Sequence, residues 1–183
     1  MAASRKRLDL VAAAKALIHR QGYYATTLAD IAHTAKVPVG NVYYYFKTKA
    51  DIAGAAIVDY RRWFTDTLKQ LDELPRPEQR IAGFLDIPLA HLAQYASNGC
   101  PIGSLCQEFG KSEDVLLQRI AAILSDQVAW IAEQFRLLNH ADPQADALDF
   151  IARVQGSILL AQALRKKNIL ADAIQRLRRD VLK

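Results

Sequence analysis

The sequence predicts an all-α protein with a small N-terminal three-helix domain and a larger helical domain behind it. Apolar residues recur every three to four positions along nearly the whole chain, which is the period of amphipathic helices. Strand-like alternation is absent, and Gly and Pro fall where helices would end. The chain has 183 residues, 51% of them hydrophobic and 23% charged, so it can bury the core of a globular protein.

Capping residues, glycines and prolines set the expected helix bounds. Gly22 ends the first helix, and a capping box of Thr27 and Asp30 opens the second. Thr48 starts a similar box, Ser112 is expected to cap a later helix, and Pro88 is expected to kink the helix that contains it. After the first, the predicted helices cover residues 28–35, 39–45, 48–71, 78–97, 101–110, 113–138, 143–166 and 169–182.

The segment 27–46 predicts a helix-turn-helix, a unit whose second helix fits the major groove of DNA. Four consecutive helical side chains cannot all point inward, so with Val42 and Phe46 buried the tyrosines between them must largely face solvent. Asparagine can pair with adenine through two hydrogen bonds, whereas tyrosine and lysine suit phosphate oxygens. The expected exposed residues of this helix are Val39, Gly40, Asn41, Tyr44 and Tyr45.

Positive charge is concentrated in the same part of the chain. Residues 1–50 hold eight Lys or Arg and two Asp, a net charge of +6, whereas the rest of the chain carries −1. A basic head on a nearly neutral body indicates that the head binds a polyanion such as double-stranded DNA and that the body has another task.

Three ordered segments, 22–27, 30–32 and 37–49, resemble the DNA-binding domain of the tetracycline-repressor (TetR/AcrR) family. The resemblance covers about residues 8–52. It implies an all-helical homodimer of about nine helices per subunit, with a DNA-binding domain over 1–50 and an effector-binding and dimerisation domain over 51–183. It also implies a ligand-responsive repressor that binds a palindromic operator as a dimer and is released by a small molecule.

By position, the resemblance implies that Thr27, Tyr43 and Lys49 contact phosphates. It implies base or groove contacts from Val39, Gly40, Asn41, Tyr44 and Tyr45.

The chain departs from the family pattern at two positions. Lys36 stands where the family's turn usually has glycine, and a left-handed backbone there would cost a non-glycine residue roughly 1 kcal/mol. In exchange, Lys36 adds a cation near the DNA. Pro38 stands where the family favours Ser or Thr as a helix cap, and it offers no side-chain acceptor.

The larger domain is rich in aromatic residues and carries little diagnostic chemistry. Because it is nearly neutral, we expect a largely apolar effector, held between the helices over 48–71, 78–97 and 113–138. The candidate ligand-binding residues are aromatic, or polar on otherwise apolar helices: Trp63, His91, Gln94, Gln107, Gln127 and Trp130.

Small residues inside the apolar helix over 143–166 permit close approach of a second helix. Together with the last helix it can form the four-helix bundle of a homodimer, although packing within one chain is the alternative. The candidate interface residues are Gly156, Leu159, Ile174 and Leu177.

Cys100 is the remaining distinctive residue. It lies at the start of the helix over 101–110, where the helix dipole would lower the thiol pKa, so a redox or electrophile sensor is one alternative. Burial of both cysteines as small hydrophobes is another. An activator or an architectural protein without an effector is a further alternative, whereas an enzyme using Cys100 is not expected, because no base lies near it in sequence.

The sequence also predicts several absences. The four histidines are too scattered for a metal site, and no phosphate-cradling glycine loop suggests a cofactor. No apolar run approaches the about 18–20 residues that span a membrane, and no signal peptide is evident. We therefore expect a cytoplasmic protein outside the membrane.

Overall fold

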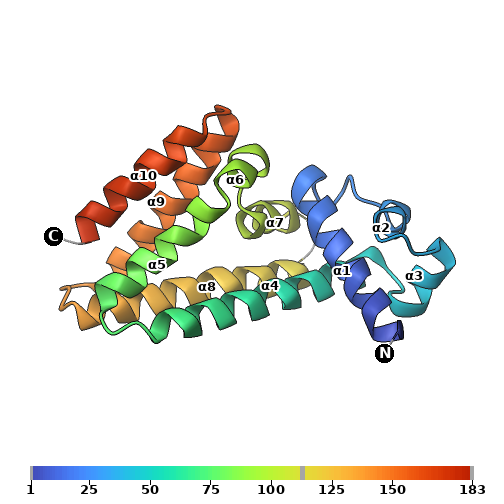
Figure 1. The fold of residues 1–183 in the computed structure, drawn as a ribbon, viewed down its shortest axis with the longest axis horizontal. Coiled ribbons are helices and arrows are strands. Elements are labelled where there is room, and N and C mark those ends of the chain that lie inside the picture. The colour runs from blue at the N-terminus through green and yellow to red at the C-terminus, as the bar shows by residue number, and fades with distance from the viewer. Residues whose placement is uncertain (1, 112–113, 182–183) are drawn as a thin grey trace. The chain divides into compact units, whose positions relative to one another are not determined.

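The computed structural model describes residues 2–111 and 114–181, and these residues form helices without a strand (Figure 1). The all-α prediction is confirmed. Ser112, the expected cap of α8, lies outside the described residues. The helices of the described ranges are α1 (Ala2–Gln21), α2 (Leu28–Thr34), α3 (Val39–Tyr45), α4 (Lys49–Asp72), α5 (Pro77–Ala90), α6 (Leu92–Asn98), α7 (Pro101–Phe109), α8 (Asp114–Leu137), α9 (Pro143–Ala163) and α10 (Lys167–Val181).

One expected helix is interrupted. The helix predicted over 78–97 is broken at His91, whose φ of −111° and ψ of 22° are not helical. Pro88 lies inside α5 and is buried there, so the interruption falls about one turn beyond the expected kink. The described ranges contain ten helices where about nine were expected, because α5 and α6 together correspond to one predicted helix.

The chain divides into two compact units. Unit 1 comprises Met1–Arg62 with Ser104–Ala121, and unit 2 comprises Trp63–Gly103 with Ala122–Lys183. Unit 1 therefore contains the predicted three-helix domain together with the first part of α4, the end of α7 and the start of α8. The domain boundary expected near residue 50 falls inside α4 and remains a prediction.

The core of unit 1 forms where α1 packs on α2 and α2 packs on α3. Leu10, Ile31 and Val42, one from each of these helices, are fully buried. An ion pair fastens α1 to α4, with Lys15 Nζ 2.6 Å from Asp59 Oδ2. Burial acts to raise the pKa of Asp59, but the hydrogen bond and charge of Lys15 outweigh it and hold the pKa below its usual value, so the pair stays charged at neutral pH.

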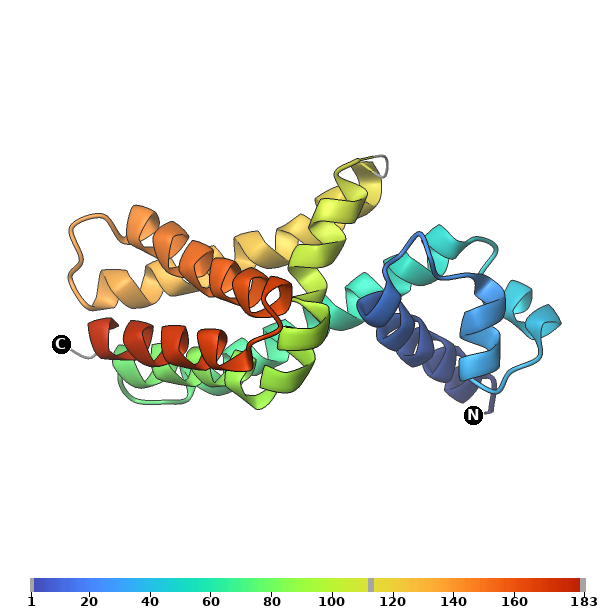
Figure 2. The same ribbon diagram turned by 90° about the horizontal axis from the view of Figure 1, so that it is seen from above.

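In unit 2, α9 packs against α6 and α10, and α10 also packs against α5 and α6 (Figures 1 and 2). Leu170, Ile174 and Leu177 recur at helical spacing on α10 and are buried. Arg178 on the same helix donates hydrogen bonds to the Asp86 carboxylate and to the Ala82 carbonyl of α5. The apolar stripe of α10 is thus held against α5 by a polar contact beside it.

By length and composition alone, helix α8 is long and apolar enough to cross a membrane. The expectation that no segment of the chain would meet this criterion is wrong. Buried residues recur along it at helical spacing, among them Ile120, Ile123 and Ile131, while Arg119 and Asp126 are exposed. A core helix of a soluble protein passes the same test, so α8 is weak evidence for a membrane span.

Candidate nucleic-acid interface

A complete capping box fixes the start of α2. The Thr27 hydroxyl accepts the Asp30 N–H at 3.1 Å, and the Asp30 carboxylate accepts the Thr27 N–H at 2.9 Å. The hydrogen bonds from the Thr27 hydroxyl and N–H lower the pKa of Asp30, so this carboxylate remains ionised at neutral pH. Thr48 and Asp51 form the same reciprocal pair just before α4. Both predicted capping boxes are confirmed.

The turn between α2 and α3 has the geometry expected from Lys36 and Pro38, the two positions at which the sequence departs from the family pattern. Lys36 has a φ of 56°, in the left-handed region that favours glycine. Pro38 precedes α3 and makes no side-chain capping hydrogen bond. The turn is closed instead by backbone hydrogen bonds, from Val37 N–H to the Ala32 carbonyl at 2.9 Å and from Asn41 N–H to the Pro38 carbonyl at 2.8 Å.

Replacing Lys36 with glycine is expected to raise the free energy of unfolding by about 0.5–1 kcal/mol, because glycine relieves the left-handed strain but loses more backbone entropy on folding. Lys36→Ala keeps the strain and removes the charge, so it should give no such gain. If Lys36 contacts phosphate, both variants should reduce the salt dependence of DNA binding by about one ion. Thermal unfolding and binding titrations at several salt concentrations measure the two effects, and equal stability of the two variants would contradict the strain argument.

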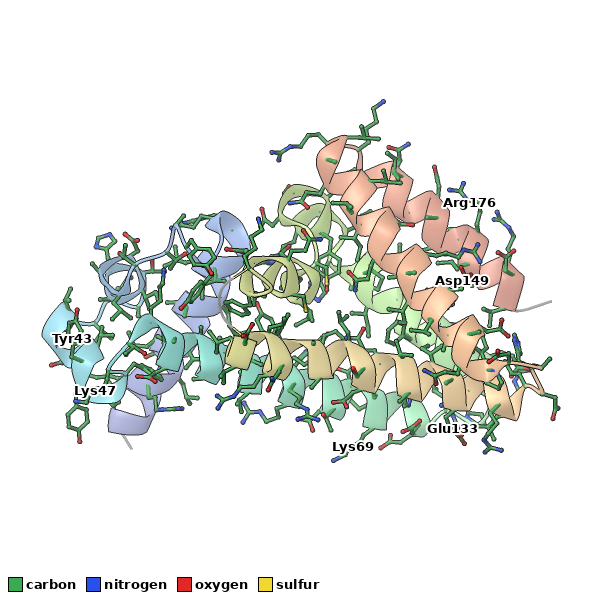
Figure 3. All side chains as sticks on the ribbon, turned by 180° about the vertical axis from the view of Figure 1, so that it is seen from behind. Tyr43, Lys47, Lys69, Glu133, Asp149 and Arg176 are labelled. Carbon is green, nitrogen blue, oxygen red and sulfur yellow. The ribbon has the colours of Figure 1, made fainter. Side chains whose placement is uncertain are left out.

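Helix α3 presents the side chains expected to meet DNA. Val42 and Phe46 are buried, as predicted, while Tyr44 is 76% exposed and Tyr43 is 49% exposed. Figure 3 shows Tyr43 and Lys47 at the outer surface by α3. Val39, Gly40 and Asn41 are exposed as well. The exposed face of the second helix therefore carries the predicted polar and aromatic groups.

Three of the expected DNA-contacting residues have other partners within unit 1. Tyr45 is only half-buried rather than exposed, and its ring packs edge-on against Tyr44 with centroids 4.9 Å apart. Lys49 Nζ donates to the Tyr23 carbonyl at 3.0 Å and lies 4.3 Å from the centroid of the Tyr23 ring. Thr27 uses its hydroxyl in the capping box. Their roles toward phosphate and base remain predictions.

Glu108 was not recognised from the sequence, yet it joins α7 to the end of α1. Its carboxylate accepts the Tyr23 N–H at 2.8 Å and the Tyr24 N–H at 3.4 Å. Gly22, with a φ of 90°, ends α1 immediately before these two N–H groups, and a Cβ at Gly22 would lie 3.2 Å from Glu108 Oε2. Phe109 is fully buried and packs edge-on against the Tyr23 ring at 5.0 Å. No local sequence pattern connects these residues.

The candidate ligand-binding residues do not form one cluster. In unit 2, Gln127 is 97% buried and its side chain makes no hydrogen bond to the described residues, whereas His91 and Gln94 are exposed. Trp63 is 41% exposed, with its ring 6.4 Å from that of His91. Trp130 stacks on Phe84 at 6.0 Å and donates its indole N–H to Asp72 at 2.9 Å. Gln107 is exposed and belongs to unit 1.

Cys100 is buried, as the alternative of a small hydrophobe predicted, whereas Cys106 is half-buried. Burial raises the pKa of the Cys100 thiol, and the hydrogen bonds from the Gly103 N–H and the Gln155 side chain do not offset the loss of solvent. The expectation of a lowered pKa at a helix start is therefore wrong, because desolvation of the thiolate outweighs the helix dipole. Neither Cys100 nor Cys106 forms a disulfide with a described residue.

The four candidate interface residues divide into two pairs. Ile174 and Leu177 are buried within the single chain, so they are not available to a partner subunit. Leu159 is 53% exposed, and a Cβ at Gly156 would meet nothing within 4 Å. Further exposed leucines that the sequence reasoning did not select lie on α9 and at its end: Leu148, Leu160 and Leu164.

Residues 10–56 match the family model described as bacterial regulatory proteins, tetR family. A TetR regulatory protein from Rhodobacter sphaeroides is 28% identical, with a TM-score of 0.81 over 94% of this chain and 96% of that one. A TetR regulator from Chloroflexus aurantiacus J-10-FL is 25% identical, with a TM-score of 0.84 over 99% and 96%. A TetR-family regulator from Agrobacterium tumefaciens is 18% identical, with a TM-score of 0.88 over 97% and 98%. No curated protein matches the sequence.

A capped helix-turn-helix with an exposed second helix, followed by a helical body, is typical of DNA-binding transcriptional regulators. The chain is similar to TetR-family transcriptional regulators, through the family model over residues 10–56 and through a fold shared over nearly its whole length.

Proposed function

We propose that the protein is a ligand-responsive repressor that binds a palindromic operator as a homodimer in the cytoplasm and is released by a small, largely apolar effector. The observation that carries the proposal is the exposed face of α3, where Asn41, Tyr43 and Tyr44 stand free of the core. Asn41 makes no side-chain hydrogen bond to the described residues, so its amide is available to a base edge.

Asn41→Ala is expected to weaken binding to the preferred sequence by about 1–3 kcal/mol and to relax specificity at one base position. An operator is first selected from a random DNA pool, and the affinities of both proteins are then measured on single-base variants of it. Gln118→Ala, which removes an exposed amide from α8 in unit 1, should leave affinity and base preference unchanged. Unaltered base preference in Asn41→Ala would remove α3 as the recognition helix.

Gln127 supports an effector site in unit 2. The residue is 97% buried and its side chain makes no hydrogen bond to the described residues, so a ligand that supplies a partner for the amide would gain a hydrogen bond there. The surroundings of α8 are apolar and aromatic, with Phe84 against Trp130 and against Phe150. An apolar molecule with one hydrogen-bonding group fits this chemistry.

A reciprocal effect between effector and operator is the expected signature of this switch. A compound found by screening for operator release should bind about 5–150-fold more weakly when operator DNA is present, because coupling of about 1–3 kcal/mol acts equally on both ligands. Calorimetry with and without operator measures the factor. Gln127→Leu should weaken the compound without weakening the operator. Equal affinity of the compound in both titrations would favour an activator or an architectural protein without an effector.

A stripe on α9 supports the homodimer. Leu160 and Leu164, at and just beyond the end of α9, are each more than half exposed, and they follow Gly156 at successive four-residue steps. Beside them, α9 and α10 line a hollow of about 320 Å³. An apolar stripe of this kind with an adjacent hollow suits self-association about a twofold axis.

A further inference from the structure

A groove in unit 1 combines an apolar floor with two arginine side chains. Its volume is about 540 Å³, within the range of small-molecule sites, and its walls come from α1, the end of α3, α4 and the start of α8. We call it the Arg119 groove, after the residue that α8 contributes to it. It is separate from the effector site proposed in unit 2 and does not depend on that site.

The floor of the Arg119 groove leaves large apolar side chains in contact with water. Val58 on α4 is 65% exposed and Val115 on α8 is 64% exposed, and both line the groove together with the buried ring of Phe46. Apolar side chains that converge on one depression from separate helices favour an apolar occupant, because their burial releases ordered water.

The two arginines give the groove its charge preference. Arg7 lies over the Phe46 ring at 5.1 Å, and Arg119 Nη1 lies 3.3 Å from the position of a Cβ at Gly54, so the missing side chain of Gly54 lets Arg119 approach α4. Within the described residues neither arginine has an acidic partner. Asp51 also lines the groove, but its Oδ2 already accepts the N–H groups of residues 47 and 48.

We propose that the Arg119 groove binds an amphipathic carboxylate, a molecule with an apolar chain or ring and one terminal carboxylate. The carboxylate pairs with the guanidinium groups, whose fork of N–H donors matches its two oxygens, and the apolar part covers Val58 and Val115. The occupied groove places a negative charge beside Tyr45 at the end of α3. Binding therefore weakens the association of unit 1 with DNA by electrostatic repulsion.

Calorimetry of the full-length protein with octanoate tests the proposal, with 1-octanol as an uncharged control of equal chain length. We expect saturable binding of one octanoate per chain and at least about tenfold weaker binding of the alcohol, as loss of a charge-assisted hydrogen bond implies. Arg119→Gln should weaken octanoate about tenfold, and Arg119→Lys, which keeps the charge but loses the fork of N–H donors, should weaken it less than Arg119→Gln does. Val58→Asp, which sets a carboxylate in the floor, should abolish binding.

Matched controls separate this site from others. Arg5→Gln changes an exposed arginine on α1 that does not line the groove, and Gln127→Leu changes unit 2, so both should bind octanoate normally. Arg119 and Val58 are exposed, so their variants should keep the circular dichroism spectrum of the unmodified protein. Absence of saturable binding, equal affinity for 1-octanol, or unchanged affinity in Arg119→Gln would each overturn the proposal. Loss of binding in Gln127→Leu alone would assign octanoate to unit 2 and leave only the effector proposal standing.

Discussion

Replacing Phe109 with alanine is expected to lower the free energy of unfolding of unit 1 by about 3–5 kcal/mol. Phe109 is fully buried, and its ring packs edge-on against Tyr23, which is itself 97% buried. The substitution removes a whole aromatic ring from a fully buried position beside Tyr23, so it leaves a cavity that the surrounding residues fill only in part. The expected loss of stability therefore has two contributions, the burial energy of the ring and its edge-to-face contact with Tyr23.

Thermal unfolding followed by circular dichroism measures this loss. At about 4–8 °C per kcal/mol for a domain of this size, the midpoint of unit 1 should fall by more than about 12 °C. Hydrogen exchange should show the loss of protection in α1 and α2, because these helices share the core of unit 1. Val115→Ala, in the same returning segment but 64% exposed, should change stability by less than about 0.5 kcal/mol. A midpoint unaffected by Phe109→Ala would mean that the segment 104–121 does not complete the core of unit 1.

Replacing Leu160 with aspartate is expected to separate the proposed dimer and to weaken operator binding about 100-fold or more. Leu160 is 52% exposed in the single chain and borders the hollow between α9 and α10. An aspartate at this exposed position should change the stability of the single chain little. In a homodimer, however, the two subunits would bury two carboxylates near the twofold axis, which is unfavourable. Two linked half-sites bind about 10²–10⁴ more tightly than one, and the monomer loses that gain.

Light scattering and operator titration measure the two consequences. Leu137→Asp, at an exposed leucine on α8, is the matched control and should remain dimeric. Gly156→Trp is a second test, because a Cβ at Gly156 meets nothing within 4 Å in the single chain, and the added indole is expected to obstruct a partner subunit. A monomeric unmodified protein at micromolar concentration, or a dimeric Leu160→Asp that binds operator normally, would refute the interface on α9.

Local patterns were sufficient to predict the elements of the candidate DNA interface. The capping boxes join residues three apart, and the turn is closed by residues within five of each other. Such interactions depend on backbone conformation and nearest neighbours, so residue type and spacing predict them. For the same reason the sequence predicted α3 within its observed bounds and the burial of Val42 and Phe46.

The sequence was less informative wherever desolvation or a distant partner decided the outcome. A helix start suggested a reactive Cys100, but packing buries the thiol and raises its pKa. Apolar spacing marked Ile174 and Leu177 as an interface, whereas α5 and α9 cover this helix within the chain. Amphipathic spacing identifies which face of a helix is buried and leaves open which surface buries it.

The sequence by itself determined the helical architecture, the capped helix-turn-helix and the family resemblance, because these follow from short-range backbone chemistry. Only the tertiary structure decided which distant segments complete unit 1. Glu108 binds the Tyr23 N–H across 85 positions, and Lys49 binds the Tyr23 carbonyl across 26. The same folding brings Val115 and Arg119 of α8 beside Val58 and Arg7. Contacts of this range depend on how whole helices pack, and no periodicity in the chain encodes which partner each helix will meet.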